Sequence, residues 1–277
     1  MTEGTGFLPG TVCWVDASTS DPAASRDFYA GLFGWTYRID TDPASGHYTW
    51  ALLDDRPVAG LAGSPAADGQ PLVWTVYLTS GDVDGTAAAV SSRGGAVLYG
   101  PADVPGQGRM CVATDPSGAA VGFWAPVPEW DFVVQAPGAL CWAELDTREA
   151  GLADEFFAEQ FGYRQDQVGD GATVDYAVWS LGGTALLGRR RLGADVGTDV
   201  LPHWTAFFAV DPAVGVDGAV ERAVALGGRV TGEPEDSGFG RVALVQDPVG
   251  AAFALIDPTR ATAAVEVLAE NDDPYDD

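Results

Sequence analysis

The chain has few basic residues. Its 14 Lys and Arg stand against 40 Asp and Glu, which gives a formal net charge of −26. Such a charge repels nucleic-acid phosphates and anionic lipid, so neither nucleic acid nor a membrane is expected as a partner. The plain interpretation is a strongly solvated surface. A cleft that attracts a cationic ligand stays open as an alternative, because composition does not show where the charges lie.

Long apolar runs are lacking as well. No stretch approaches the roughly 20 apolar residues that a membrane span needs. Residues 1–10 lack the basic segment and the apolar core of a secretory signal. We therefore expect a cytoplasmic protein.

Cysteine and histidine are scarce. The three cysteines Cys13, Cys111 and Cys141 show no CxxC spacing, so we predict buried free thiols. The two histidines, His47 and His203, stand at unrelated places, which favours surface or loop positions over metal ligation. A conventional zinc site is not expected.

An internal repeat is the most informative feature that the chain does contain. Cys13-Trp14-Val15-Asp16 recurs as Cys141-Trp142-Ala143-Glu144, 128 residues later. Further matches are Phe28-Tyr29-Ala30 with Phe156-Phe157-Ala158, Phe33-Gly34 with Phe161-Gly162, Trp74-Thr75 with Trp204-Thr205, Gly94-Gly95 with Gly227-Gly228, Gly108-Arg109 with Gly240-Arg241, and a DPxG turn at 115–118 with one at 247–250. A period near 130 residues indicates a duplicated domain.

Helix and turn signals divide each half into two βαβββ units, which predicts an α+β fold. Asp21-Pro22 begins the first helix and Gly34 ends it. Helices are expected at 22–33, 83–92, 151–160 and 213–225, and strands at 10–17, 36–39, 48–53, 58–62, 73–79, 96–99, 109–114, 120–124, 140–145, 176–180, 185–189, 204–210, 229–231, 241–245 and 252–256. The predicted domains are 10–126 and 138–258, with tails at 1–9 and 259–277, a Pro-containing linker at 127–137, and disorder at 271–277.

Two segments of the sequence resemble a known protein family. GTVCWVDASTSDPAASRDFYAGLFGW resembles the opening, and DVPGQGRMCVATDPSGAAVGFW the end, of a domain of the vicinal-oxygen-chelate superfamily, the glyoxalase, bleomycin-resistance and extradiol-dioxygenase group. The resemblance covers nearly the whole chain and is strongest to a two-domain actinobacterial glyoxalase-like branch. It implies paired βαβββ units that form a curved mixed sheet around a U-shaped cavity. It also implies a divalent metal that chelates two neighbouring substrate oxygens.

The metal-ligand positions implied by the resemblance hold other residues. In the family they carry His, Gln or Glu on the first strand of a unit and Glu on the last. Here they fall at Trp14, Thr75, Trp142 and Thr205 on the first strands, and near Gly60, at Gly122, near Leu187 and at Ala254 on the last strands. None of these is a usual metal ligand. We therefore expect no metal and no other cofactor, and the family's metal chemistry does not follow from the fold.

Strand alternation predicts which side chains face the cavity instead. Trp14 shares a face with Asp16, and Trp142 shares one with Glu144. The predicted ligand-binding residues are Trp14, Thr75, Tyr77, Arg109, Trp124, Trp142, Thr205, Phe207 and Arg241. Such a pocket suits a flat, partly aromatic ligand, although core packing is an equal interpretation of the two tryptophans.

The candidate acid/base residues are Asp16 and Glu144, because a buried unpaired carboxylate is costly. One interpretation is structural pairing of Asp16 with Arg109 and of Glu144 with Arg241. The other is a desolvated carboxylate that acts as a general acid or base.

The leading functional hypothesis is a protein that binds a small aromatic metabolite or drug, as metal-free resistance members of the superfamily do. The alternative is a metal-independent hydrolase, isomerase or cyclase of specialised metabolism that uses Asp16 or Glu144. A metal-dependent glyoxalase or dioxygenase ranks third, and a noncatalytic interaction protein stays open. Because the duplicated halves form a pseudo-dimer, a monomer is expected, with a homodimer as the alternative.

Overall fold

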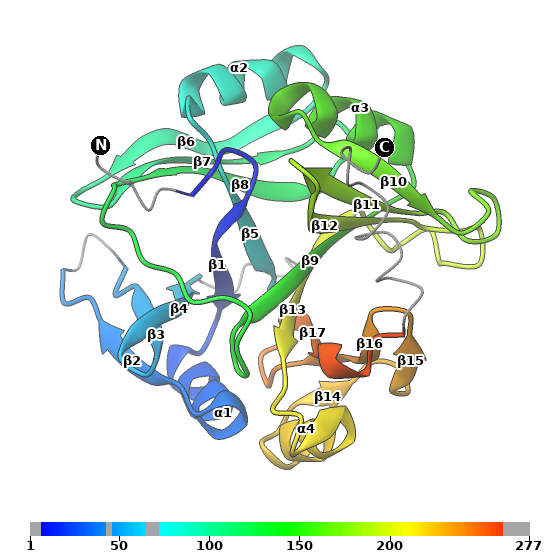
Figure 1. The fold of residues 1–277 in the computed structure, drawn as a ribbon. Coiled ribbons are helices and arrows are strands. Elements are labelled where there is room, and N and C mark those ends of the chain that lie inside the picture. Colours follow the sequence, from blue (N-terminus) through cyan, green and yellow to red (C-terminus); the bar gives the residue numbers. More distant parts are fainter. Residues whose placement is uncertain (1–6, 43–45, 65–71, 263–277) are drawn as a thin grey trace, which may run out of the picture. The chain divides into compact units, whose positions relative to one another are not determined.

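The computed structural model describes residues 7–42, 46–64 and 72–262 (Figure 1). The first half contains β1 (Val12–Thr19), α1 (Pro22–Phe33), β2 (Thr36–Ile39), β3 (Thr49–Leu53), β4 (Arg56–Gly63), β5 (Trp74–Thr79), α2 (Val83–Ser92), β6 (Ala96–Val104), β7 (Gly108–Thr114) and β8 (Ala120–Pro126). The second half contains β9 (Leu140–Thr147), α3 (Ala150–Phe161), β10 (Arg164–Val168), β11 (Tyr176–Leu181), β12 (Thr184–Arg191), β13 (His203–Ala209), α4 (Gly215–Ala225), β14 (Arg229–Val230), β15 (Glu235–Ser237), β16 (Gly240–Gln246) and β17 (Ala252–Asp257). The predicted α+β tandem duplication of βαβββ units is confirmed.

The strands form one mixed sheet per half. The strand order is β2-β3-β4-β1-β5-β8-β7-β6 in the first and β10-β11-β12-β9-β13-β17-β16-β14 in the second, where β15 pairs with β16. The first strand of each βαβββ unit runs parallel to the last strand of the same unit. This register places the first-strand residues opposite the last-strand residues of their own unit.

The chain forms two compact units, and each takes segments from both halves. The α2–α3 unit consists of Met1–Val15, Thr75–Asp131 and Trp142–Thr205. The α1–α4 unit consists of Asp16–Trp74, Phe132–Cys141 and Ala206–Asp277. The predicted division into successive domains at 10–126 and 138–258 therefore stays a prediction.

The helix signals read from the sequence act as predicted. The Asp21 carboxylate accepts hydrogen bonds from the backbone N–H groups of Ala23 and Ala24, at 3.1 and 3.0 Å. Gly34 ends α1 in the left-handed conformation, with φ of 77°. The predicted bounds of α1 and α2 are confirmed, and α3 and α4 differ from the predicted bounds by one or two residues at their ends.

Two strands were not predicted. β10 has the sequence RQDQV and β15 has the sequence EDS, so neither shows an apolar alternation. β10 forms because its backbone pairs with β11 at the end of the sheet, which its side chains do not encode. The acidic segment expected to be disordered, 271–277, lies outside the described residues.

The three cysteines are free and buried, as predicted. Burial raises the pKa of the Cys13 and Cys141 thiols to about 12, so both stay protonated at neutral pH. No helix in the described part of the chain is long and apolar enough to span a membrane.

Aromatic side chains fill the core of the α1–α4 unit. The rings of Tyr29 and Trp74 meet edge to face, with centroids 5.5 Å apart. The Trp74 indole N–H donates to the Tyr29 hydroxyl at 3.2 Å, and that hydroxyl donates to Asp247 Oδ2 at 3.1 Å. The buried polar groups of Trp74, Tyr29 and Asp247 are thereby hydrogen-bonded within an otherwise apolar core.

The α2–α3 unit repeats this core without the central hydroxyl. By the sequence repeat, Phe157, Trp204 and Asp115 are the equivalents of Tyr29, Trp74 and Asp247. Phenylalanine at 157 has no hydroxyl to bridge the other two. Within the described residues, Trp204 Nε1 and Asp115 Oδ2 are buried and have no hydrogen-bond partner.

Restoring the missing hydroxyl should therefore stabilise the protein. We expect Phe157→Tyr to raise the free energy of unfolding by about 1 kcal/mol, because one hydroxyl would serve two unpaired groups. The matched change Tyr29→Phe should lower it by about 1–3 kcal/mol, because it leaves two groups unpaired. Urea and thermal unfolding of both variants measure these shifts. If Phe157→Tyr destabilises the fold, the two cores are not equivalent.

Candidate functional site

A cluster of charged side chains lies where β9 and β12 run parallel in the second half. Alternate residues of β9 point to one face, so Glu144 and Asp146 lie side by side. In the register of the two strands, Gly188 stands opposite Glu144 and Arg190 stands opposite Asp146. Two carboxylates and one guanidinium are thus brought together by strand pairing alone.

Gly188 gives room to an aromatic ring beside Glu144. A Cβ at this position would collide with the Tyr176 hydroxyl and would reach within 2.9 Å of Trp142 Nε1. The Trp142 indole donates a hydrogen bond to the Tyr176 hydroxyl at 3.1 Å. That hydroxyl in turn donates to the Glu144 carboxylate.

Arg190 is the cation between the two acidic groups. Its Nε lies 2.6 Å from Asp146 Oδ1 and 3.3 Å from Glu144 Oε1. Asp146 Oδ2 has further neighbours in the Thr205 hydroxyl, at 3.4 Å, and His203 Nε2, at 3.5 Å. The better hydrogen-bonded acid is Asp146, so Glu144 is the one whose charge is less compensated.

Burial raises the pKa of the Glu144 carboxyl to about 7, and repulsion by the Asp146 carboxylate adds to this rise. Arg190 and the hydrogen bond from Tyr176 act in the opposite direction but do not cancel it. A carboxyl with a pKa near 7 can both accept and release a proton at neutral pH. Burial and the neighbouring Glu144 raise the pKa of Tyr176, so its phenol stays a neutral donor.

A cavity of about 440 Å³ adjoins the cluster and is lined by residues 172–176 and 190–196. Tyr176 and Arg190 belong both to its wall and to the surroundings of Glu144. Half of the Arg190 side chain is exposed, against 12% of the Glu144 side chain. The volume falls in the range of small-molecule sites. The cavity wall therefore includes two residues, Tyr176 and Arg190, that contact the Glu144 carboxyl.

Arg148 holds the loop that forms one side of this cavity. Its guanidinium donates to the backbone carbonyls of Val196, Gly197 and Val200, at 3.1, 2.7 and 2.7 Å. Residues 193–196 of the loop line the cavity. The cavity wall is therefore held by the side chain of the residue that follows β9.

The first half carries a simpler version of the same arrangement. Tyr48 donates to Asp16 Oδ2 at 3.1 Å, and Asp16 stands opposite Gly60 on the parallel strand. A Cβ at Gly60 would collide with the Tyr48 hydroxyl. Ser18 and Ala62 stand where the second half has Asp146 and Arg190. Tyr48 and Gly60 match Tyr176 and Gly188 at the same 128-residue offset, a signal that could have found these residues in the sequence.

Trp14, Trp124 and Tyr77 lie in the α2–α3 unit. Trp14 and Trp124 each lie 5.2 Å from the ring of Trp130, which belongs to the expected linker. The ring of Tyr77 occupies the space that a Cβ on Gly122 would need. Their predicted role in ligand binding stays a prediction.

Thr75 and Phe207 are placed by β5 and β13. Thr75 is half-buried, and Phe207 is buried in the α1–α4 unit. The Phe207 backbone carbonyl accepts a contact from the Cys141 thiol at 3.5 Å. Among the predicted ligand-binding residues, Trp142 and Thr205 are the ones that the structure brings to the Glu144 cluster.

The predicted pairing of Asp16 with Arg109 and of Glu144 with Arg241 is wrong. The bonds formed are Arg109 with Asp84 and Asp103, at 2.7 and 2.8 Å, and Arg241 with Asp217 and Asp236, at 2.7 and 3.4 Å. Asp84 and Asp217 lie in the first turns of α2 and α4. The repeated arginines therefore tie strands to helix starts, and Glu144 pairs with Arg190 instead.

The side chains at the implied metal-ligand positions do not fit a divalent metal. The Trp142 indole has only a donor, and the space at Gly188 is filled by a tyrosine ring. Over 7–42, 46–64 and 72–262, no three His, Cys, Asp or Glu side chains are grouped to hold a metal ion. The positive charge beside Glu144 and Asp146 comes from the Arg190 guanidinium.

Comparison with known proteins gives consistent matches. The family model described as "Glyoxalase/Bleomycin resistance protein/Dioxygenase superfamily" matches residues 12–123. The anthracycline biosynthesis protein DnrV of Streptomyces peucetius is 40% identical over 267 residues, which cover 91% of this chain and 95% of DnrV. The putative glyoxylase CFP32 of Mycobacterium tuberculosis is 35% identical over 93% of this chain and 98% of its own length. The Mn(II)-bound glyoxalase from Novosphingobium aromaticivorans superposes with a TM-score of 0.60 at 16% identity, over 92% of this chain and 86% of that one, a likeness of fold.

The raised pKa of Glu144 has a consequence for stability. Between 4.5, the ordinary carboxyl value, and about 7, the folded protein holds a proton that the unfolded chain releases. The unfolding free energy should therefore fall as pH rises through this window, by up to about 3 kcal/mol. Glu144→Gln should flatten this slope and should be the more stable protein above pH 7.

Urea unfolding measured from pH 4 to pH 8 tests this expectation. Glu155→Gln, at an exposed position of α3, is the matched control and should keep the slope of the unchanged protein. Parallel curves for Glu144→Gln and the unchanged protein would mean that Glu144 ionises as an ordinary carboxyl group.

Proposed function

Because this chain belongs to the glyoxalase/bleomycin resistance protein/dioxygenase superfamily, we propose that it transfers a proton on a small aromatic metabolite, with Glu144 in place of the metal chemistry of the family. The observation that carries the proposal is the Glu144 carboxyl. It is buried, it is bonded by Tyr176 and Arg190, and its pKa is raised to about 7. Buried carboxyls with such values are typical of acid/base catalysts.

The neighbouring residues have separate tasks in this proposal. Ionised Glu144 accepts a proton from a ligand carbon next to a carbonyl group, and protonated Glu144 returns it at another position. Tyr176 holds the carboxyl in place through its hydroxyl. Arg190 donates to Asp146 through Nε, and its terminal amino groups can donate to a ligand oxygen on which negative charge builds up.

An aromatic ligand is supported by the side chains around Glu144 and by the relatives. Trp142 and Tyr176 present flat rings beside the carboxyl, and Tyr176 reaches the cavity wall. DnrV, which shares 40% identity with this chain, is named an anthracycline biosynthesis protein. We therefore take polycyclic aromatic compounds of specialised metabolism as the ligand class.

Binding without turnover is the second candidate function. It is favoured by the first half, where Asp16, Tyr48 and Gly60 repeat the arrangement without the second acid and without the arginine. A carboxylate bonded by one phenol can hold a ligand hydroxyl group, but it lacks a cation to stabilise a developing charge.

A proton-transfer assay separates the two candidates. The probe is anthrone under nitrogen, whose CH₂ group next to the conjugated carbonyl system exchanges with D₂O, a reaction followed by ¹H NMR. We expect the protein to accelerate the exchange, with a rate that rises with pH around 7. Glu144→Gln should lower the accelerated rate at least about 100-fold, whereas the control Asp16→Asn should change it little.

Binding is measured on the same variants by quenching of tryptophan fluorescence with 1,8-dihydroxyanthraquinone. If Glu144→Gln keeps the affinity but loses the exchange, the acid/base role stands. Binding without any accelerated exchange in the unchanged protein would leave the second candidate. If neither probe binds, an aromatic ligand is excluded.

A further inference from the structure

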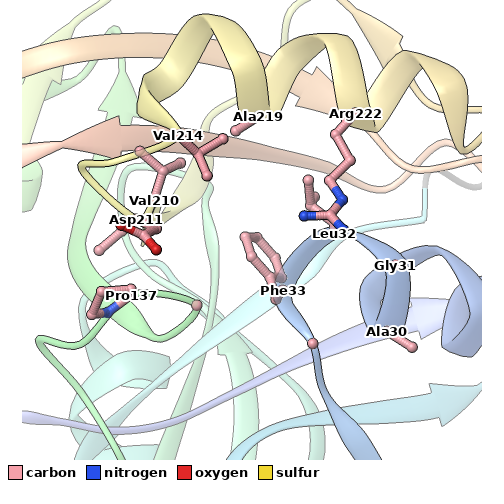
Figure 2. Close-up of a pocket in the computed structure, with 13 residues that line it drawn as sticks. Ala30, Gly31, Leu32, Phe33, Pro137, Val210, Asp211, Val214, Ala219 and Arg222 are labelled. Carbon is pink, nitrogen blue, oxygen red and sulfur yellow. The ribbon is translucent and has the colours of Figure 1, made fainter.

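A second cavity, of about 290 Å³, lies in the α1–α4 unit and shares no residue with the cluster around Glu144 (Figure 2). Its wall is mainly apolar, and the apolar lining residues include Leu32, Phe33 and Val210. Its charged lining residues, Asp211 and Arg222, are exposed. The charged neighbours of Glu144 belong to the α2–α3 unit, and a further titratable group of that unit, His203, lies beside them.

His203, the first residue of β13, is oriented by two contacts of its imidazole ring. Nδ1 lies 2.8 Å from the Leu201 carbonyl oxygen, and Nε2 lies 3.5 Å from Asp146 Oδ2. A carbonyl oxygen only accepts hydrogen bonds, so Nδ1 carries a hydrogen and donates it. In the neutral ring Nε2 is then a bare acceptor that faces a carboxylate. The contact with Asp146 is therefore favourable when Nε2 is protonated as well, which makes the ring a cation.

Asp146 connects this imidazole to the proposed catalytic carboxyl. Its Oδ2 faces His203, whereas its Oδ1 accepts from Arg190 Nε at 2.6 Å. The same Nε lies 3.3 Å from Glu144 Oε1. Arg190 is thus shared between two carboxyl groups, and His203 contacts the one that holds it more closely. A change of charge on His203 reaches Glu144 through Asp146 and Arg190.

The charged and titratable side chains of the cluster come from four strands, and they are Glu144 and Asp146 of β9, Tyr176 of β11, Arg190 of β12 and His203 of β13. The Arg148 guanidinium, which follows β9, is occupied by the backbone carbonyls of residues 196–200. The exposed fraction of the side chain is 43% for His203, 12% for Glu144 and 1% for Asp146. His203 is therefore the titratable group of this cluster that exchanges protons with water most readily.

We propose that His203 is a positioning residue for the proton transfer at Glu144, an inference that rests on the function proposed above. A proton on His203 holds the Asp146 carboxylate and leaves more of the Arg190 guanidinium to Glu144, so that Glu144 is ionised and acts as the base. When His203 loses this proton, Asp146 draws Arg190 to itself, and Glu144 keeps its own proton and acts as the acid. Tyr176 donates its hydrogen bond in both states.

The ionisation of Glu144 in the ligand-free, full-length protein tests this proposal. Protein labelled with [5-¹³C]glutamate is titrated by ¹³C NMR, and the Glu144 signal is the one that Glu144→Gln removes. The unchanged protein should titrate near pH 7 at this carboxyl. His203→Gln removes the cation and should move the midpoint upward by at least about 0.5 pH. His203→Lys keeps a positive charge and should leave the midpoint at or below that of the unchanged protein.

Two further variants test the path and the specificity of the effect. In an Asp146→Asn background, His203→Gln should move the midpoint less than half as far, because the connecting carboxylate is absent. His47→Asn is the control, since His47 is exposed and its φ of 59° is one that asparagine adopts readily. It should leave the titration of Glu144 unchanged.

The proposal is overturned if His203→Gln leaves the midpoint where it was. It is also overturned if the glutamine and lysine variants move it equally in the same direction, which a merely structural role would do. Anthrone exchange is scored separately: where it is accelerated, its rise with pH should move upward in His203→Gln. If the midpoint responds to His203 but no exchange is accelerated, the coupling stands and the proton-transfer function is overturned.

Discussion

A carboxyl group inside a β-sheet needs hydrogen-bond donors from the protein, because water reaches it poorly. Glu144 meets this constraint with the Tyr176 hydroxyl and the Arg190 guanidinium. The tyrosine donor depends on Gly188, since a Cβ there would collide with the Tyr176 hydroxyl. The compensation is incomplete because Asp146 takes the shorter bond to Arg190. Burial, and then repulsion by the Asp146 carboxylate, outweigh this compensation and raise the pKa of Glu144 to about 7.

Because the domain is duplicated, residues at equivalent positions of the two copies can be compared. Where the first half has Tyr29, the second has Phe157, and the loss of one hydroxyl leaves two buried groups unpaired. Where the α2–α3 unit has Gln160, whose side chain donates to the Thr86 hydroxyl, the α1–α4 unit has Leu32, which lines a cavity. In both cases the strand order is kept, and the polar groups at equivalent positions differ. The copies have thus diverged in chemistry while they share one order of strands.

Local signals made much of the fold predictable. Asp21 and Gly34 mark the ends of α1, and the repeat revealed four βαβββ units and the acidic residues Asp16 and Glu144. The strand β10 could not be found this way, because its polar residues carry no alternation and only backbone pairing forms it. The partner of Glu144 was assigned to Arg241 because both recur in the repeat, whereas the true partner Arg190 occurs in one half only. Pairing of parallel strands, which sets that contact, is a property of the register and is not written in local composition.

Each compact unit is assembled from segments of both halves. The core that joins Tyr29 to Asp247 takes its hydroxyl from the first copy of the repeat and its carboxylate from the second. The two copies are therefore not independent modules that evolution could exchange or discard one at a time. A substitution in one copy changes the packing of residues from the other copy, because both contribute to the same core. Selection therefore acts on the two copies together.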